Sequence, residues 1–233
     1  MIGKFEFNNL ISSDFGIYLS GSGTYNAPER DTESISIPGK NGDIIVDKHR
    51  FKNIKVKYPA FIREEFKSNT DAVRAWILKD ANYHRLEDSY HPEEYRMARF
   101  IGPLDFVTRV LNESGECDIE FDCKPQRFLK DGELPIYITE DSKIYNPTLF
   151  DALPTIRVYG TEGTLIIGNI IMSIKEIDEY VDIDCETQNA MKGIENKNHT
   201  ISNAFPTLYS GENGVKIEGN ISKIEIIPRW WTI

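Results

Sequence analysis

Three carboxylates alternate with apolar residues in one short segment of the chain. In 117–123 (CDIEFDC), Asp118, Glu120 and Asp122 are separated by residues typical of a core. Successive side chains of a strand point to opposite faces, so the three carboxylates are expected to share one face of a sheet. One interpretation is a solvated sheet face. The other is an electronegative surface past which something anionic slides without sticking.

The abundance of acids also raises the question of hydrolysis. Glycoside hydrolysis needs two carboxylates that face each other across a cleft, and no spacing singles out such a pair among the 37 acidic residues. The sequence contains no GxSxG, HExxH, P-loop or GxGxxG motif. The segment 21–23 (GSG) is expected to be a flexible turn, with no following helix start that would cradle a phosphate. We therefore predict no catalytic residues and no cofactor.

The histidines and cysteines lack the spacing of metal ligands. His84 and His91 lie among acidic residues, where a metal site can be imagined, but a polar loop after a helix is the preferred interpretation. Cys117, Cys123 and Cys185 form no CxxC pair. Buried, reduced thiols are therefore expected, rather than a disulfide framework or a structural zinc site.

Two adjacent tryptophans, Trp230 and Trp231, stand near the end of the sequence. In a strand they point to opposite faces, so one enters the core beside Ile224 and Ile226 while the other faces outward or packs on another domain. An outward aromatic side chain can stack on a sugar, which makes Trp231 and Tyr209 weak candidates for a saccharide site. Packing is the preferred interpretation, because two contiguous residues do not make a platform.

Composition narrows the class of protein. The chain has 233 residues, of which 40% are hydrophobic and 27% charged, and its net charge is -10. An acidic chain is a poor match for nucleic acid or anionic lipid, which are held chiefly by Lys and Arg. No apolar run reaches the roughly 18 residues of a membrane span, and the first residues lack the pattern of a signal peptide. We expect synthesis in a cytoplasm, with neither a membrane nor a specific nucleic-acid sequence as partner.

Period-two alternation predicts strands through most of the first half. Strands are expected at 15–19 and 54–58, and a hairpin at 34–46 around the turn sequence PGKNG. A helix is predicted over 68–79, because Val73, Trp76 and Ile77 share one helical face. Trp76 is expected to be a core anchor.

Polar residues are expected to define the ends of that helix. Ser68, Asn69 and Thr70 are candidate N-caps. Asp71 is expected in the first turn and Lys79 in the last, where each is favourable to the helix dipole.

The second half is predicted to be a separate all-β unit. Pro125 cannot donate to a strand ladder, so the sheet is expected to end there, with a boundary between 125 and 133. The expected domains are 1–130 and 133–233. Short strands without a convincing helix indicate a β-sandwich in the second. They are predicted at 156–158, 165–167, 181–185, 215–217 and 224–226.

Several stretches, taken together and in order, resemble the distal tail protein (Dit) family of long-tailed bacteriophages. None of them is specific alone, but they span nearly the whole chain. They are IPGKNGD at 37–43, LEDSYHPEEYRMA at 86–98, FDCKP at 121–125, NPT at 146–148, PTIRVYGTEGT at 154–164, DCET at 184–187 and IIPRWW at 226–231.

The resemblance implies a structural protein of the virion. It implies a mainly β chain, in which an N-terminal β-sheet or β-sandwich domain with one α-helix forms a tail-tube-like ring and a galectin-like β-sandwich follows. It also implies a homo-hexamer at the tail tip that joins the tail tube to the tip. The implied partners are the tail tube protein, the tape measure protein, a tail-associated lysin or tip hub protein, and a receptor-binding protein.

Two departures from the family pattern matter. The second half has about 100 residues, with no room for inserted carbohydrate-binding modules. Cys185 stands where relatives often have a small polar residue, which we interpret as a packing change. A galectin-like fold by itself does not imply sugar binding.

Three hypotheses of different classes follow. The first is a structural hub with no catalysis, in which strand 117–123 turns its acidic row toward a lumen or a neighbouring subunit. The alternative is a carbohydrate-binding adhesion module that acts through the C-terminal sandwich. A glycosidase or cell-wall hydrolase is the weakest.

Overall fold

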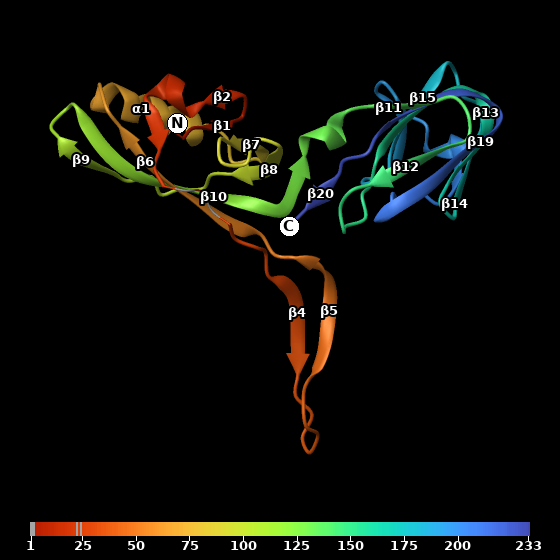
Figure 1. Cartoon of the computed structure of the whole chain (residues 1–233), viewed down its shortest axis with the longest axis horizontal. Coiled ribbons are helices and arrows are strands. Elements are labelled where there is room, and N and C mark those ends of the chain that lie inside the picture. The colour runs from red at the N-terminus through yellow and green to blue at the C-terminus, as the bar shows by residue number, and fades with distance from the viewer. Residues whose placement is uncertain (1–2, 22, 24) are drawn as a thin grey trace. The chain divides into compact units, whose positions relative to one another are not determined.

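The computed structural model describes residues 3–21, 23 and 25–233. The start of the chain and the turn expected at 21–23 therefore lie partly outside the described residues. The fold is mainly β, as predicted, with a single α-helix in the part described (Figure 1). The chain divides into two compact units, one ending at Arg127 and including Ile233, the other Phe128–Thr232. That 1–130 and 133–233 fold as separate domains stays a prediction.

An antiparallel sheet organises the first unit, with strand order β2-β1-β7-β8-β10-β6-β3 and with β9 also paired to β10. Two strands, β4 and β5, form a sheet of their own. The elements up to β10 are β1 (Phe5–Phe7), β2 (Leu10–Ile11), the 3-10 helix η1 (Ser12–Phe15), β3 (Ile17–Leu19), β4 (Arg30–Ile35), β5 (Ile44–Phe51), β6 (Ile54–Ile62), α1 (Phe66–Ile77), β7 (His84–Asp88), β8 (Glu94–Arg99), β9 (Phe106–Val110) and β10 (Ser114–Leu129).

The strands β6 and β10 are neighbours in this sheet. They pair antiparallel from Gly115 opposite Ile62 to Cys123 opposite Ile54. One face carries the buried core residues of 117–123, and the other carries the acidic row. The alternation in the sequence therefore predicted the faces of this strand correctly.

The helix α1 covers the buried face of the sheet, with Val73, Trp76 and Ile77 inside. Trp76 is 8% exposed, stacks on Phe15 at 4.4 Å between ring centroids, and donates its Nε1–H to the carbonyl of Phe7 at 3.2 Å. The predicted core anchor is confirmed.

The predicted ends of the helix were two residues late. Glu65, in the left-handed region at φ 48°, precedes the first turn, and Phe66 packs against the core. The candidate caps at 68–70 therefore lie inside the helix. Asp71 falls outside the first turn and Lys79 lies beyond the end, so neither has the predicted position at the helix dipole.

The prediction that the sheet ends at Pro125 was wrong, because β10 continues to Leu129. Pairing with β6 stops at Cys123. Pro125 thus lies past the last β6 pair, where the missing N–H costs that ladder nothing.

The hairpin β4–β5 confirms the hairpin expected at 34–46 (Figure 1). Ile35 pairs with Ile44 and Ser34 with Ile45. Most of its side chains are exposed, including those of Ile35, Ile44, Ile45 and Val46.

The second unit is built on β19, which pairs with β11, β12 and β13; the sheet continues from β13 through β15 and β16 to β17, and β14 joins β13 to β18. Its remaining elements are the 3-10 helix η2 (Lys130–Glu133), β11 (Ile136–Ile138), β12 (Ser142–Asn146), β13 (Thr155–Ile167), β14 (Ile170–Ile174), β15 (Tyr180–Asp184), β16 (Asn189–Lys192), β17 (Glu195–Asn196), the 3-10 helix η3 (Asn198–Thr200), β18 (Ile201–Asn203), β19 (Gly211–Ile227) and β20 (Trp231–Thr232).

Two predicted pairs of short strands are single long strands. The strands expected at 156–158 and 165–167 are both part of β13, and those at 215–217 and 224–226 are both part of β19. The register shifts at Gly160 and Gly163. A Cβ on Gly160 would lie 2.2 Å from the carbonyl oxygen of Asn220, so these glycines allow close backbone approach at a bulge and do not end a strand.

The three cysteines are free and buried, as expected. Burial raises the pKa of each thiol to about 12. Within the described residues, no helix has the length and apolar character needed to cross a membrane.

Candidate functional site

The acidic row lies on the face of the first sheet opposite the core, and every carboxylate in it has a cationic partner. Lys57 of β6 reaches Asp118 at 2.7 Å, and Lys55 reaches Glu120 at 2.7 Å. Arg99, the last residue of β8, meets Asp122 at 2.8 Å.

A fourth pair extends this arrangement, because Arg109 of β9 contacts Glu116 of β10 at 2.6 Å. Four bases thus face four acids across neighbouring strands. This set is named the charge ladder: Lys55, Lys57, Arg99, Arg109, Glu116, Asp118, Glu120 and Asp122.

The ion pairs shift the pKa values of several of these groups. The hydrogen bond and charge of Glu120 raise the pKa of Lys55, and those of Asp118 raise the pKa of Lys57. The hydrogen bond from Arg109 lowers the pKa of Glu116. With four bases and four acids, the ladder is formally neutral as a set.

Sequence analysis missed the basic half of the ladder. Lys55 and Lys57 alternate with the buried residues of β6, and this pattern was visible in the sequence. What the sequence did not show was that β6 pairs with β10 in the register that sets Lys57 opposite Glu120 and Lys55 opposite Asp122. Each lysine then reaches diagonally to the next carboxylate along β10.

An open cleft of about 510 Å³ runs beside the ladder. Its lining includes Lys57, Pro103, Arg109, Glu116, Asp118 and Glu120. Two of the ion pairs, Lys57 with Asp118 and Arg109 with Glu116, line this cleft, so the charges on its surface are paired.

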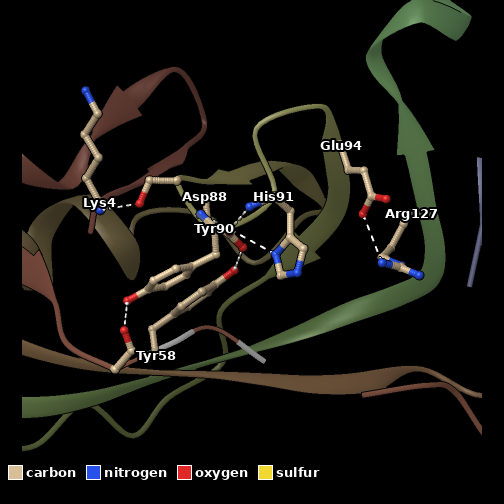
Figure 2. A network of polar contacts seen from close by, with 9 residues as sticks. Lys4, Tyr58, Asp88, Tyr90, His91, Glu94 and Arg127 are labelled. Atoms are coloured by element: carbon tan, nitrogen blue, oxygen red, sulfur yellow. Dashed lines mark hydrogen bonds and ion pairs between the residues drawn. The ribbon is translucent and has the colours of Figure 1, made fainter. Parts of the chain in front are cut away.

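A second polar cluster fixes the turn between β7 and β8 (Figure 2). Tyr58 donates its hydroxyl to Asp88 at 2.7 Å, and the other oxygen of Asp88 accepts the backbone N–H groups of Tyr90 and His91, each at 2.9 Å. His91 Nδ1 lies 3.2 Å from the same oxygen. Burial, followed by the charge of Asp88, raises the pKa of Tyr58 well above its usual range.

This cluster fixes the backbone of the β7–β8 turn, and the space inside it is too small for a substrate. The void among Tyr58, Asp88, His91 and Arg127 has a volume of about 10 Å³, the space of one water. Glu94 and Arg127 close one side with a 3.1 Å ion pair, drawn in Figure 2. The segment 86–98, which contributed to the family resemblance, is thus a braced β-hairpin.

The preferred interpretation of His84 and His91 as part of a polar loop after a helix was wrong for His84 and holds for His91 only in that it lies in a turn. His84 begins β7, and His91 lies in the turn between β7 and β8. Each histidine pairs with an aspartate, His84 with Asp80 at 2.9 Å and His91 with Asp88. Over the described ranges, no group of three or more His, Cys, Asp or Glu side chains could hold a metal ion.

The two tryptophans divide as their adjacency predicts. Trp230 is buried in the second core. Trp231 is half-buried, stacks on Phe150 at 4.5 Å between centroids, and donates its Nε1–H to the carbonyl of Asp151 at 2.9 Å. Tyr209 is 45% exposed. Saccharide binding by Trp231 and Tyr209 stays a prediction.

Comparison with known proteins gives one decisive result. No family model and no curated protein matches the sequence. The crystal structure of SPP1 Dit, described as a paradigm of the hub adsorption apparatus in phages that infect Gram-positive bacteria, matches 100% of both chains with a TM-score of 0.77 and 11% identity. The chain has the fold of SPP1 Dit.

Two structures of the phage p2 baseplate in its activated conformation are also similar. The one with Sr has a TM-score of 0.52 and 12% identity over 97% of this chain and 96% of that chain. The one with Ca has a TM-score of 0.51 and 11% identity over 97% of each. The Dit resemblance deduced from sequence landmarks is therefore confirmed at the level of the fold.

Proposed function

We propose that this chain is the distal tail protein of a long-tailed phage or prophage, a structural hub that performs no catalysis. The observation that carries the proposal is the match to SPP1 Dit along the whole length of both chains. A match confined to one unit would support only a shared module.

The hub is a ring of six copies at the tail tip, assembled in the cytoplasm of the host bacterium. It joins the tail tube protein to a tail-associated lysin or tip hub protein and to the receptor-binding protein, close to the tape measure protein. The sequence landmarks support these assignments through the family resemblance, and the Dit fold supports them through its phage hub and baseplate neighbours.

The exposed hairpin β4–β5 supports self-assembly. An isolated two-stranded hairpin is marginally stable in water, and this one exposes Ile35, Ile44 and Val46 on one face. A second copy of the chain that covers this face would remove apolar surface from water and fix the hairpin.

The charge ladder supports a position on the wall of the ring channel. DNA is retained by cations that replace its counterions, and every ladder cation is engaged by a carboxylate. A neutral wall of this kind lets DNA pass. In this proposal, the acidic row Asp118, Glu120 and Asp122 prevents retention by holding the cations.

Deletion of the gene from the phage or prophage tests the proposal. A hub predicts that deletion leaves particles without completed tails, and that the wild-type gene supplied in trans restores them. An adhesion module predicts complete tails that fail to adsorb to cells. Electron microscopy of the particles and an adsorption assay separate the two, and complete tails in the deletion strain would contradict the hub.

A further inference from the structure

Two asparagines in this chain precede a glycine, Asn41 before Gly42 and Asn213 before Gly214. In such a pair the backbone nitrogen of glycine can attack the side-chain carbonyl carbon of asparagine. Glycine favours the attack because it has no Cβ to obstruct it and because its backbone is permissive. Whether the reaction occurs depends on how firmly each pair is held.

Asn41 lies in the loop 36–43 at the end of the β4–β5 hairpin. Asn41 and Gly42 are both exposed. Gly42 has φ +81°, and nothing lies within 4 Å of the position that a Cβ would occupy. Exposed loop tips of this kind move readily, so the side chain and the glycine nitrogen can reach the geometry of attack.

The side chain of Asn213 is fixed by burial and by hydrogen bonds. It is 2% exposed and belongs to β19. Its amide nitrogen donates to the carbonyls of Tyr209 at 2.8 Å and Gly211 at 3.0 Å, and its amide oxygen accepts the N–H of Tyr209 at 2.9 Å. Attack by Gly214 would require these three hydrogen bonds to break.

We propose that Asn41 is a site of spontaneous deamidation in the folded free chain, whereas Asn213 is protected. The Gly42 nitrogen bonds to Cγ of Asn41, its proton leaves with the amide nitrogen as ammonia, and a five-membered succinimide forms. Water then opens the ring at either carbonyl. One product is aspartate, and the other is isoaspartate, in which the backbone runs through the side-chain carbons.

Conversion adds a negative charge beside Asp43, and the isoaspartate form lengthens the loop by one carbon. If the hairpin contacts a second copy, as the proposed function has it, assembly slows the reaction by holding the loop. Modified Asn41 is then expected to be more frequent in chains that remained unassembled for a longer time. This consequence rests on the proposed function, whereas reactivity of the free chain does not.

The test is incubation of the purified full chain at mildly alkaline pH, with peptide mapping by mass spectrometry over time. Isoaspartate is identified by isoaspartyl methyltransferase labelling. Asn41 is expected to convert in the folded protein at nearly its rate in urea, whereas Asn213 converts only in urea. An unchanged Asn41 in the folded chain, or equal conversion at both sites, overturns the proposal.

Two variants serve as controls. In Asn41→Gln the longer side chain disfavours ring closure, so the acidic species that accumulates on ion exchange is expected to disappear. Asn213→Gln should leave that species unchanged if the variant folds, and the urea series gives the same comparison if it does not. Equal Asn41 conversion in free chains and in particles would contradict the hairpin contact but leave the site intact.

Discussion

At the scale of single residues, the main effect of the β10 carboxylates is to neutralise the lysine and arginine side chains of neighbouring strands. Exposed ion pairs contribute little to stability, typically below about 1 kcal/mol each. Lys57 with Asp118 and Lys55 with Glu120 are such pairs, since their side chains are about half exposed or more. In the proposed channel wall, these pairs would matter because they occupy the cations.

Removing three of the four carboxylates of the ladder should make this face adhesive to DNA. The triple variant Asp118→Asn, Glu120→Gln, Asp122→Asn removes the three carboxylates that pair with Lys57, Lys55 and Arg99. Particles that carry it are expected to eject DNA more slowly at low ionic strength, and added salt should restore the rate. The measurement is ejection in vitro, followed by a DNA-binding dye.

The matched control adds Lys55→Gln and Lys57→Gln to the triple variant. This control keeps the three carboxylate-to-amide substitutions but removes the charges of Lys55 and Lys57. Ejection should therefore return toward the wild-type rate. Wild-type ejection by the triple variant at low salt would show that this face does not line the DNA path.

A carboxylate of the second unit gives a prediction on pH. Burial raises the pKa of Asp184, but the hydrogen bond and charge of Arg229, at 2.8 Å, together with backbone hydrogen bonds from Glu186 and Thr187, outweigh it and hold the pKa below the usual 3.8. Because the folded-state pKa is depressed, the stability from this pair is present above the ordinary pKa and is lost as pH falls through the folded value.

Asp184→Asn is therefore expected to lower Tm at neutral pH, with the difference from wild type shrinking between about pH 5 and about pH 3. Thermal unfolding followed by circular dichroism measures this. A Tm difference that stays constant with pH would show that the charge of Asp184 contributes nothing.

At the scale of elements, regular alternation was informative and single breaker residues were misleading. The strand at 117–123 and the helix around Trp76 follow from local periodicity, so the sequence predicted both. Pro125 was taken as the end of its sheet, and the strand predicted at 156–158 stopped short of Gly160, because the effect of such a residue depends on the neighbouring strand. The paired strand has to be known before it is clear that Pro125 lies beyond the β6 ladder and that Gly160 lies against the backbone of β19.

Trp76 should dominate the attachment of α1 to the sheet. Trp76→Ala removes a side chain that is 8% exposed and stacked on Phe5 and Phe15. The expected loss is about 3–5 kcal/mol in the free energy of unfolding. Urea denaturation followed by circular dichroism provides the value.

Leu78→Ala is the control for that substitution, because Leu78 follows the helix and is 51% exposed. Its effect should stay within about 0.5 kcal/mol. Similar losses in the two variants would contradict the role of Trp76 as the anchor.

The hairpin β4–β5 permits a test of the proposed subunit contact with two neighbouring residues. Ile44 shares a face with Ile35 and Val46, whereas Ile45 points to the opposite face with Ser34. Ile44→Asp is expected to abolish ring assembly, and Ile45→Asp to preserve it. Mass photometry of the chain, assembled with its tail proteins, reports the outcome.

Both side chains are exposed in the single chain, so neither variant should change its Tm by much. Equal assembly of the two variants would show that the apolar face of the hairpin is not the contact.

At the scale of the whole molecule, the order of weak landmarks was the informative signal. At 11% identity to SPP1 Dit, no single stretch identifies the fold, and the resemblance to the Dit family was inferred from the order of several stretches, from IPGKNGD to IIPRWW. The charge ladder was only half visible, because its basic residues lie on other strands. A ring of six copies was implied by the family resemblance alone, because an assembly depends on which surfaces of separate copies meet.

The most direct measurement is a cryo-electron microscopy reconstruction of the tail tip of particles that contain this chain. The account predicts a closed ring of six copies continuous with the tail tube, with Lys55, Lys57 and the carboxylates of β10 on the channel wall. A map in which the chain is absent from the tube axis and decorates the outside of the tail as separate copies would contradict it.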